Sequence, residues 1–316
     1  MKVILPGGSG QVGQSLARAF VADGAEVVIL SRDPRPVPNV RVVLWDAETL
    51  GEWRKEFEGA DVVINLAGRS VNCRYTLENR RLILESRVKS TRVVGQAIAA
   101  CSTPPPVWLQ SATATIYAHR YDAPNDDIAG IIGGNEPRIP DTWKFSYDVA
   151  KAWEHELEIG NVPRTRKVAL RSAMVMSPDK GGIFDTLLGL VRKGLGGTSG
   201  SGKQFVSWIH EQDFYRAIRF LMEHDLSGAV NVSSPNPLPN AEFMRILRKA
   251  WGMPIGLPAS KLMLEIGAVF LRTETELILK SRRVVPTRLL EAGFGFDVPK
   301  WEDAARILCE ASRTVR

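Results

Sequence analysis

Tyr147 and Lys151 are the two residues of this sequence whose types and spacing best suit proton transfer. They lie four residues apart in a segment with a helical pattern, so their side chains are predicted to share one face of a helix. A neighbouring ammonium group favours the phenolate form and lowers the pKa of a phenol, which is ordinarily about 10. The pair is therefore a candidate for proton exchange near neutral pH, although the chain has five tyrosines and so short a match also arises by accident.

A hydroxyl-rich turn provides a third polar residue for the same chemistry. The apolar residues 107–110 are predicted to form a strand, and they lead into the sequence Ser-Ala-Thr-Ala-Thr at 111–115. Thr113 can donate a hydrogen bond to a substrate oxygen and hold it. The predicted catalytic residues are thus Thr113, Tyr147 and Lys151, acting at a carbinol or ketone carbon.

A glycine-rich turn near the amino terminus is the element that would bring a cofactor to these residues. Residues 2–5 are an apolar run typical of a buried parallel strand, and a helical pattern follows the turn. The turn fits two spacings, G-x-G-x-x-G and G-x-x-G-x-x-G, which let a pyrophosphate approach the backbone at the N-terminus of a helix. The residues predicted to bind the dinucleotide here are Gly7, Gly10, Gln11, Val12 and Gly13.

The end of the second predicted strand, residues 26–30, bears on the choice between NAD and NADP. A site that prefers NAD commonly places a carboxylate here for the ribose 2′-hydroxyl, but Ser31 and Arg32 stand at this point. A hydroxyl followed by a guanidinium suits a 2′-phosphate, so NADP(H) is predicted over NAD(H). The alternatives are that Arg32 is only a solvated loop residue and that Asp33 turns in to bind the hydroxyl.

Strands and helices alternate through the first half of the chain, which predicts an α/β fold of the Rossmann type with a doubly wound parallel sheet. A helix is predicted at 49–58. Ligands of such sheets bind at the carboxyl ends of the strands, and several further residues fall there. The cofactor site is therefore extended to Asp46, Leu66, Ala67, Gly68 and Arg171.

The alternation ends after residue 171, which divides the chain into two predicted domains. Residues 1–171 form the dinucleotide-binding domain, to which the chain returns around 205–232, and residues 172–316 form a smaller, mainly helical domain on the substrate side. Residues 119–141 are rich in Gly, Pro, Asp and Asn and are predicted to be a long loop over the site. His210 is expected to fix a strand to the following helix, with substrate contact as the alternative.

Composition narrows the classes of function. The formal net charge is +6, but the basic residues are scattered and not interleaved with aromatics, which argues against nucleic-acid binding. No apolar run is long enough to span a membrane, and no room for a signal peptide is seen before the first strand. The three cysteines have no metal-ligand spacing. A cytoplasmic protein with no metal site is expected, as a monomer or homodimer.

The order of these motifs resembles the extended short-chain dehydrogenase/reductase superfamily: the glycine turn, Asn-Leu-Ala-Gly at 65–68, the hydroxyl turn and Tyr-x-x-x-Lys. The second half is similar to an NAD(P)-dependent epimerase-like subfamily with a short C-terminal module, on the stretches 194–197, 200–204, 207–210, 228–231 and 285–294. The resemblance places the catalytic Ser/Thr at Thr113, with Ser111 as the alternative. It also implies that many members keep the pair Trp153-Glu154 but lack the tyrosine and lysine, which this chain has.

Two hypotheses follow. In the first, the protein is an NADP(H)-dependent oxidoreductase or epimerase, with a sugar nucleotide as substrate by analogy. In the second, it binds NADP(H) without turnover, as a regulatory or partner-binding protein.

Overall fold

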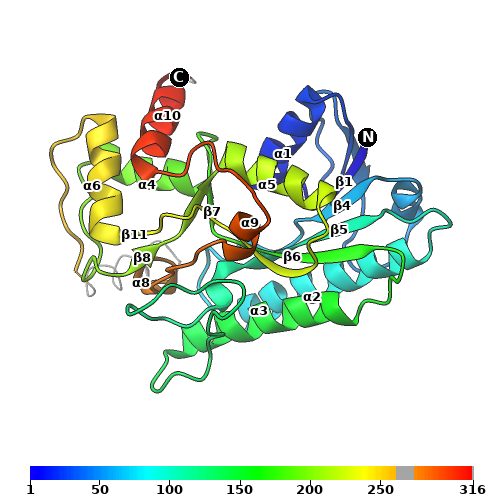
Figure 1. Ribbon diagram of the computed structural model, residues 1–316, viewed down its shortest axis with the longest axis horizontal. Helices are drawn as coiled ribbons and strands as arrows, with labels where there is room; N and C mark the ends of the chain where they lie inside the picture. The colour runs from blue at the N-terminus through cyan, green and yellow to red at the C-terminus, as the bar shows by residue number, and fades with distance from the viewer. Residues whose placement is uncertain (261–273, 315–316) are drawn as a thin grey trace.

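A seven-stranded parallel sheet forms the centre of the protein, as a computed structural model shows (Figure 1). The structure describes residues 1–260 and 274–314. The strand order is β10-β6-β5-β4-β1-β2-β3, and the predicted Rossmann-type fold is confirmed. The strands are β1 (Lys2–Pro6), β2 (Glu26–Ser31), β3 (Arg41–Leu44), β4 (Val62–Asn65), β5 (Val107–Thr113), β6 (Arg166–Ser172) and β10 (Gly228–Val232).

Helices cover both faces of this sheet. On one face lie α1 (Gln11–Ala22) and α5 (Glu211–Glu223), and on the other α2 (Leu77–Ala99) and α3 (Asp141–Ile159) (Figure 1). Each face has its own apolar core, one built around Phe20 and Phe214 and the other around Trp108 and Leu157. The helix predicted at 49–58 is instead a short 3-10 helix, η1 (Glu52–Phe57). The inner strands, such as β1 and β4, are buried on both sides, which is why they read as continuous apolar runs.

A second, mainly helical group of elements lies beside the sheet (Figure 1). Its apolar core includes Trp208, Phe243 and Trp301, with the rings of Phe243 and Trp301 stacked at a centroid distance of 4.0 Å. The helices are α4 (Ile183–Arg192), α6 (Asn240–Trp251), α8 (Glu276–Leu279) and α10 (Trp301–Thr314). Helix α9 (Thr287–Glu291) instead packs on β10, and its Leu289 belongs to the core around Phe20 and Phe214. The short strands are β7 (Met174–Met176), β8 (Phe205–Val206), β9 (Trp208–His210) and β11 (Leu238–Pro239).

The segment predicted as a long loop is fastened to the C-terminal part of the chain. It has no helix or strand before α3 begins at Asp141. The Asn125 N–H donates to the Arg283 carbonyl at 2.7 Å, and the Val285 N–H donates to the Asn125 carbonyl at 3.1 Å. The Asn125 side chain is buried and donates to the Ala118 carbonyl. These bonds hold residues 283–285 against the loop beside the first domain.

His210 has the structural role that was favoured for it. The residue is buried at the start of α5, and its Nδ1 accepts a hydrogen bond from the Gln212 N–H at 3.2 Å. This contact satisfies one of the N–H groups that a helix leaves unpaired at its first turn.

Replacing this cap should destabilise the fold. We expect His210→Ala to lower the free energy of unfolding by about 1 kcal/mol or more, because a helix loses its cap and a buried side chain is removed. His210→Asn, whose side chain can still accept from the Gln212 N–H, should keep part of that stability. Urea unfolding of the two variants measures the difference, and equal stabilities would contradict the capping role.

Candidate cofactor and substrate site

Eight of the twelve predicted cofactor residues line one cleft at the carboxyl ends of β1, β2, β3 and β4. This cofactor cleft has a volume of about 310 Å³. Its lining includes eight of the predicted residues: Gly7, Gly10, Ser31, Arg32, Asp46, Leu66, Ala67 and Gly68. Residues that the sequence analysis missed, among them Ser9, Arg69 and Ser86, also line it. Ser9 lies in the glycine turn, Arg69 follows Gly68 after β4, and Ser86 lies on α2.

The glycine turn is held by close backbone contacts. Gly7 has a positive φ of 73°, and a Cβ there would lie 2.5 Å from the Ala67 Cα. A Cβ on Gly13 would lie 2.4 Å from the Gly8 carbonyl oxygen. A Cβ on Gly10 meets no atom within 4 Å. Gly7 and Gly13 are therefore required by the fold of the turn itself, whereas Gly10 leaves open space in the cleft.

Helix α1 begins at Gln11 and directs its first turn at this space. Its first turn carries no acidic residue, and its N-cap, Gly10, has no side chain to accept a hydrogen bond. The unpaired N–H groups and partial positive charge of the helix end are therefore available to a phosphate. Val12 packs on the core, and Gln11 Nε2 is buried with no hydrogen-bond partner within the described residues.

Ser31, Arg32 and Asp33 differ in how far they are already engaged. The Ser31 hydroxyl is buried, and among the described residues it bonds only to the backbone of Asp33. Asp33 forms an ion pair with Arg35 at 2.7 Å. Arg32 is exposed, lines the cleft, and has no hydrogen bond or ion pair with any residue in 1–260 or 274–314. The guanidinium is thus available to a ligand, while the Asp33 carboxylate is drawn towards Arg35.

Asp46 lines the cleft but its carboxylate serves the local turn. Oδ1 accepts hydrogen bonds from the Glu48 and Thr49 N–H groups, both at 2.9 Å. Burial by itself would raise the pKa of Asp46, but hydrogen bonds from Thr49 and Glu48 lower it. Asp46 is therefore a charged acceptor whose position is fixed at the rim of the cleft.

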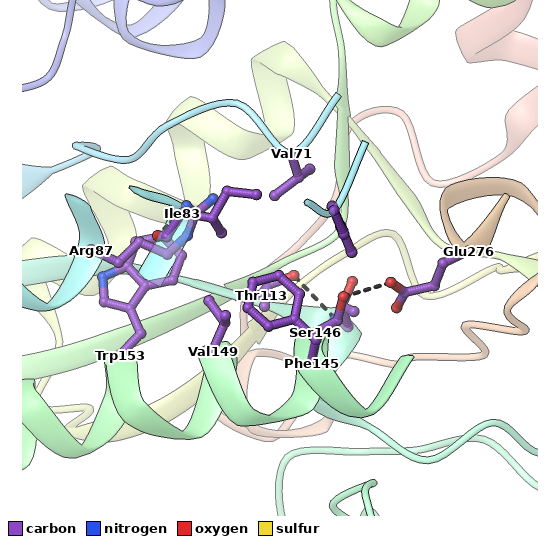
Figure 2. Close-up of a pocket in the computed structure, with 11 residues that line it drawn as sticks. Val71, Ile83, Arg87, Thr113, Phe145, Ser146, Val149, Trp153 and Glu276 are labelled. Carbon is purple, nitrogen blue, oxygen red and sulfur yellow. Dashed lines mark hydrogen bonds between the residues drawn. The ribbon is translucent and has the colours of Figure 1, made fainter. Parts of the chain in front are cut away.

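Figure 2 shows a second, smaller cavity. This hydroxyl cavity has a volume of about 110 Å³, with apolar walls from α2 and α3. Its polar lining consists of Tyr75, Arg87, Thr113, Thr115, Ser146 and Glu276. A Cβ on Gly68, in the cofactor cleft, would lie 3.3 Å from Arg87 Cζ. The two spaces therefore adjoin at Gly68 and Arg87.

Thr113 lies in the hydroxyl cavity, at the end of β5. Its Oγ1 accepts a hydrogen bond from the Thr115 N–H at 3.1 Å. Because the oxygen is held as an acceptor, the hydroxyl proton can be donated to a ligand in the cavity.

Ser146 and Glu276 meet at one end of this cavity, and Arg87 lies over the Trp153 ring at the other (Figure 2). The Ser146 hydroxyl donates to Glu276 Oε2 at 2.5 Å. The Glu276 side chain is fully buried, with Lys280 Nζ 3.8 Å and Arg282 Nη2 3.9 Å from Oε1. The sequence analysis did not single out these residues. The only available signal was the spacing of Glu276 and Lys280, four apart in the predicted helical tail.

Arg87 is a half-buried cation at the junction of the two spaces. Its Nη1 donates to the Arg69 and Ile83 carbonyls, both at 3.0 Å, and no carboxylate of the described residues lies within ion-pair distance. Burial lowers the pKa of Arg87 to about 10. A desolvated guanidinium without an acidic partner is suited to an anionic group of a ligand.

The structure does not bring Tyr147 to Thr113. Tyr147 is fully buried, its hydroxyl donates to Glu136 Oε1 at 2.8 Å, and Lys280 Nζ lies 3.6 Å from its ring centroid. Burial and the hydrogen bond to Glu136 raise the pKa of Tyr147, which is opposite to the predicted lowering. Lys151 is exposed and does not line the cavity. Adjacent helical residues point about 100° apart, so Ser146 lines the cavity and Tyr147 does not.

Arg171 is also placed away from the cofactor cleft. Its Nε and Nη2 donate to the two oxygens of Glu154 at 2.8 and 2.7 Å, and its Nη1 donates to the Tyr117 hydroxyl at 2.9 Å. The guanidinium is thus occupied within the protein. Its position at a strand end suggested a cofactor contact, but tertiary packing directs it to α3.

Comparison with known proteins identifies the family. A family model described as the NAD dependent epimerase/dehydratase family matches residues 3–233. The chain belongs to this family. A second model, a domain of unknown function, matches residues 260–308, which includes the predicted C-terminal module; residues 261–273 of that match lie outside the described residues. The predicted resemblance to the epimerase-like subfamily is therefore confirmed.

Individual members of the family are similar over nearly the whole chain. The bovine (Bos taurus) epimerase family protein SDR39U1 is 31% identical over 305 residues, covering 95% of this chain and 97% of the relative. The crystal structure of human SDR39U1 with NADPH has a TM-score of 0.84 at 28% identity and covers 98% and 99% of the two chains. A nucleoside-diphosphate sugar epimerase from Corynebacterium glutamicum has a TM-score of 0.74 at 25% identity, covering 99% of this chain and 58% of its own.

The described residues lack two features of other classes of protein. No helix among them is both long enough and apolar enough to cross a bilayer. No group of three or more His, Cys, Asp or Glu side chains within residues 1–260 and 274–314 is arranged to hold a metal ion.

A matched pair of substitutions tests the glycine turn. We expect Gly10→Ala to leave thermal stability unchanged but to weaken NADPH binding, because its Cβ meets only space that a ligand would fill. Gly13→Ala should lower both the thermal stability and the NADPH affinity, because its Cβ would collide with the Gly8 carbonyl. In an ordinary helix interior, alanine instead stabilises by about 1 kcal/mol relative to glycine. Thermal unfolding and fluorescence titration with NADPH measure the two effects. Unchanged NADPH affinity in Gly10→Ala would show that the dinucleotide does not bind here.

Proposed function

We propose that the protein is an NADP(H)-dependent oxidoreductase or epimerase that acts on a carbinol or ketone carbon. The observation that carries this proposal is the junction at Gly68 and Arg87, where the cofactor cleft meets a cavity lined by hydroxyl groups. A dinucleotide extended along the cleft would bring its reactive ring to that junction. Bound NADP(H) supplies or accepts a hydride.

Residues of the chain bind the cofactor and hold the substrate. The glycine turn and the N-terminus of α1 bind the pyrophosphate, and Arg32 binds the 2′-phosphate. Thr113 donates its hydroxyl proton as a hydrogen bond to the substrate oxygen and holds the carbon next to the cofactor. The apolar walls of the hydroxyl cavity exclude water, which strengthens that hydrogen bond.

A sugar nucleotide is the substrate class that we propose. The name of the Corynebacterium glutamicum relative supports this choice, and Arg87 offers a cation to an anionic substituent. The small volume of the hydroxyl cavity suits the reacting carbon and its neighbours, so the nucleotide part would lie outside it.

Arg32 provides the test of NADP(H) preference. We expect Arg32→Ala to weaken NADPH binding about tenfold or more, because hydrogen bonds to a charged group contribute about 1.5–3 kcal/mol. Binding of NADH, which lacks the 2′-phosphate, should be unchanged. Arg54→Ala, which removes an exposed positive charge outside the cleft, is the matched control. Equal losses for NADPH and NADH would contradict the assigned contact.

Turnover separates the enzyme from a protein that only binds the cofactor. The second function is favoured by one observation, the placement of Tyr147 and Lys151 outside the hydroxyl cavity. We expect the purified protein to interconvert epimers of a nucleoside-diphosphate sugar or to oxidise NADPH with a carbonyl substrate, and Thr113→Val to reduce this rate. If the protein binds NADPH tightly but turns over neither nucleoside-diphosphate sugars nor carbonyl substrates, the non-catalytic function is supported instead.

A further inference from the structure

We propose that Glu276, in the C-terminal module, is the proton reservoir for the reaction in the hydroxyl cavity, and that Ser146 passes this proton to and from the substrate oxygen. This inference rests on the proposed function and assigns the proton step that Tyr147 is not placed to perform. It gives a chemical role to the stretch of chain that matches the domain of unknown function.

The first argument is position. Ser146 and Glu276 line the same cavity as Thr113, and they come from α3 and α8, which are far apart in the sequence (Figure 2). The 2.5 Å hydrogen bond between the Ser146 hydroxyl and Glu276 Oε2 gives a direct path for a proton. A serine and a threonine facing one small cavity can both reach the oxygen of a bound carbinol or ketone.

One oxygen of the Glu276 carboxyl group is buried without a hydrogen bond to the described residues. Glu276 is 1% exposed, and its Oε1 is buried without a hydrogen-bond partner within the described residues. The nearest cations, Lys280 at 3.8 Å and Arg282 at 3.9 Å, are beyond hydrogen-bond distance. A buried carboxyl oxygen that lacks a donor is costly to keep in a purely structural role. Lining a substrate cavity gives it a partner when the cavity is filled.

The third argument is the charge around the pair. Burial, with Arg282 alongside, lowers the pKa of Lys280. Lys280 Nζ also donates to the Thr115 carbonyl at 2.6 Å, which fixes it beside the cavity. The titratable and charged groups that interact with Glu276 are Tyr75, Tyr147, Lys280 and Arg282. His119 and Glu136 interact with Lys280.

The proton step balances in both directions. In reduction, hydride adds to the carbonyl carbon, the C=O π pair moves to oxygen, and that oxygen takes the proton of the Ser146 hydroxyl. Ser146 regains a proton from the Glu276 carboxylic acid, and the resulting carboxylate faces Lys280 and Arg282. In oxidation each transfer is reversed: Glu276 accepts the proton through Ser146 while the carbon loses hydride to NADP⁺. No further oxidant or reductant is needed.

Removing the acid while keeping its shape is the central experiment. We expect Glu276→Gln to lower kcat about 100-fold or more, as loss of general acid–base catalysis does, with the Kd for NADPH unchanged. Ser146→Ala should lower kcat to a similar extent, and the double variant should be no slower than either single one, because both residues act in one path. Glu274→Gln is the matched control, since Glu274 is a buried carboxylate of the same module that does not itself line the cavity and bonds to the backbone N–H of Tyr75.

The pH dependence distinguishes a proton carrier from a structural residue. Reduction requires the reservoir to hold a proton, so the kcat of the wild-type protein should fall as pH rises. We expect this limb to disappear in Glu276→Gln and to persist in Glu274→Gln and Tyr147→Phe. Unchanged kcat and pH profile in Glu276→Gln would overturn the inference, and so would loss of activity in Tyr147→Phe alone.

A second readout does not depend on turnover. Infrared difference spectra of the NADP-bound protein, between acidic and alkaline buffers, should show a protonated carboxyl band that is absent from Glu276→Gln. A spectrum without that difference would reject Glu276 as a proton carrier even if the protein is active. Absence of turnover together with the carboxyl band would instead count against the proposed function and leave the titration of Glu276 established.

Discussion

The contact between Gly13 and the Gly8 carbonyl is the constraint on which the site depends. At this point the first turn of α1 approaches the loop from β1 so closely that no side chain fits between them. The approach directs the N-terminus of α1 at the cofactor cleft. A second contact, between Gly7 and Ala67, sets the spacing between the turn and the end of β4. Both contacts concern backbone atoms, so neighbouring side chains cannot relieve them by adopting other rotamers.

The hydroxyl cavity depends on a different kind of interaction, the attachment of the C-terminal module to the segment that follows β5. Lys280 Nζ donates to the Thr115 carbonyl, and Arg282 Nε donates to the Thr115 hydroxyl at 3.1 Å. Backbone bonds from Asn125 to residues 283 and 285 continue the attachment. Glu276 is thereby carried into the wall of a cavity whose other walls come from α2 and α3. The module is thus part of the candidate site as well as a cover for it.

Tyr147 shows how a motif can match in sequence and fail in space. The interval of four residues places Tyr147 and Lys151 on one face of α3, as predicted, but it does not say which face looks towards the cavity. Ser146, Val149 and Trp153 face the cavity, whereas Tyr147 lies against Glu136 and Lys280. A shift of one position along the helix decides whether a phenol is solvated beside a cofactor or is buried with a raised pKa. Arg171 is a similar case, because its strand end was correctly placed but its guanidinium bonds to Glu154.

The sequence alone determined the parallel sheet, the glycine turn and eight of the residues that line the cofactor cleft, because these follow from local apolar runs and from the rule that parallel strands end at one edge. Only the tertiary structure decided which face of α3 lines the cavity and that Glu276 and Lys280 reach it. The physical reason is that both depend on packing between segments more than 100 residues apart, as the hydrogen bonds of Ser146 with Glu276 and of Lys280 with Thr115 show, at sequence separations of 130 and 165. Local sequence patterns do not predict such contacts.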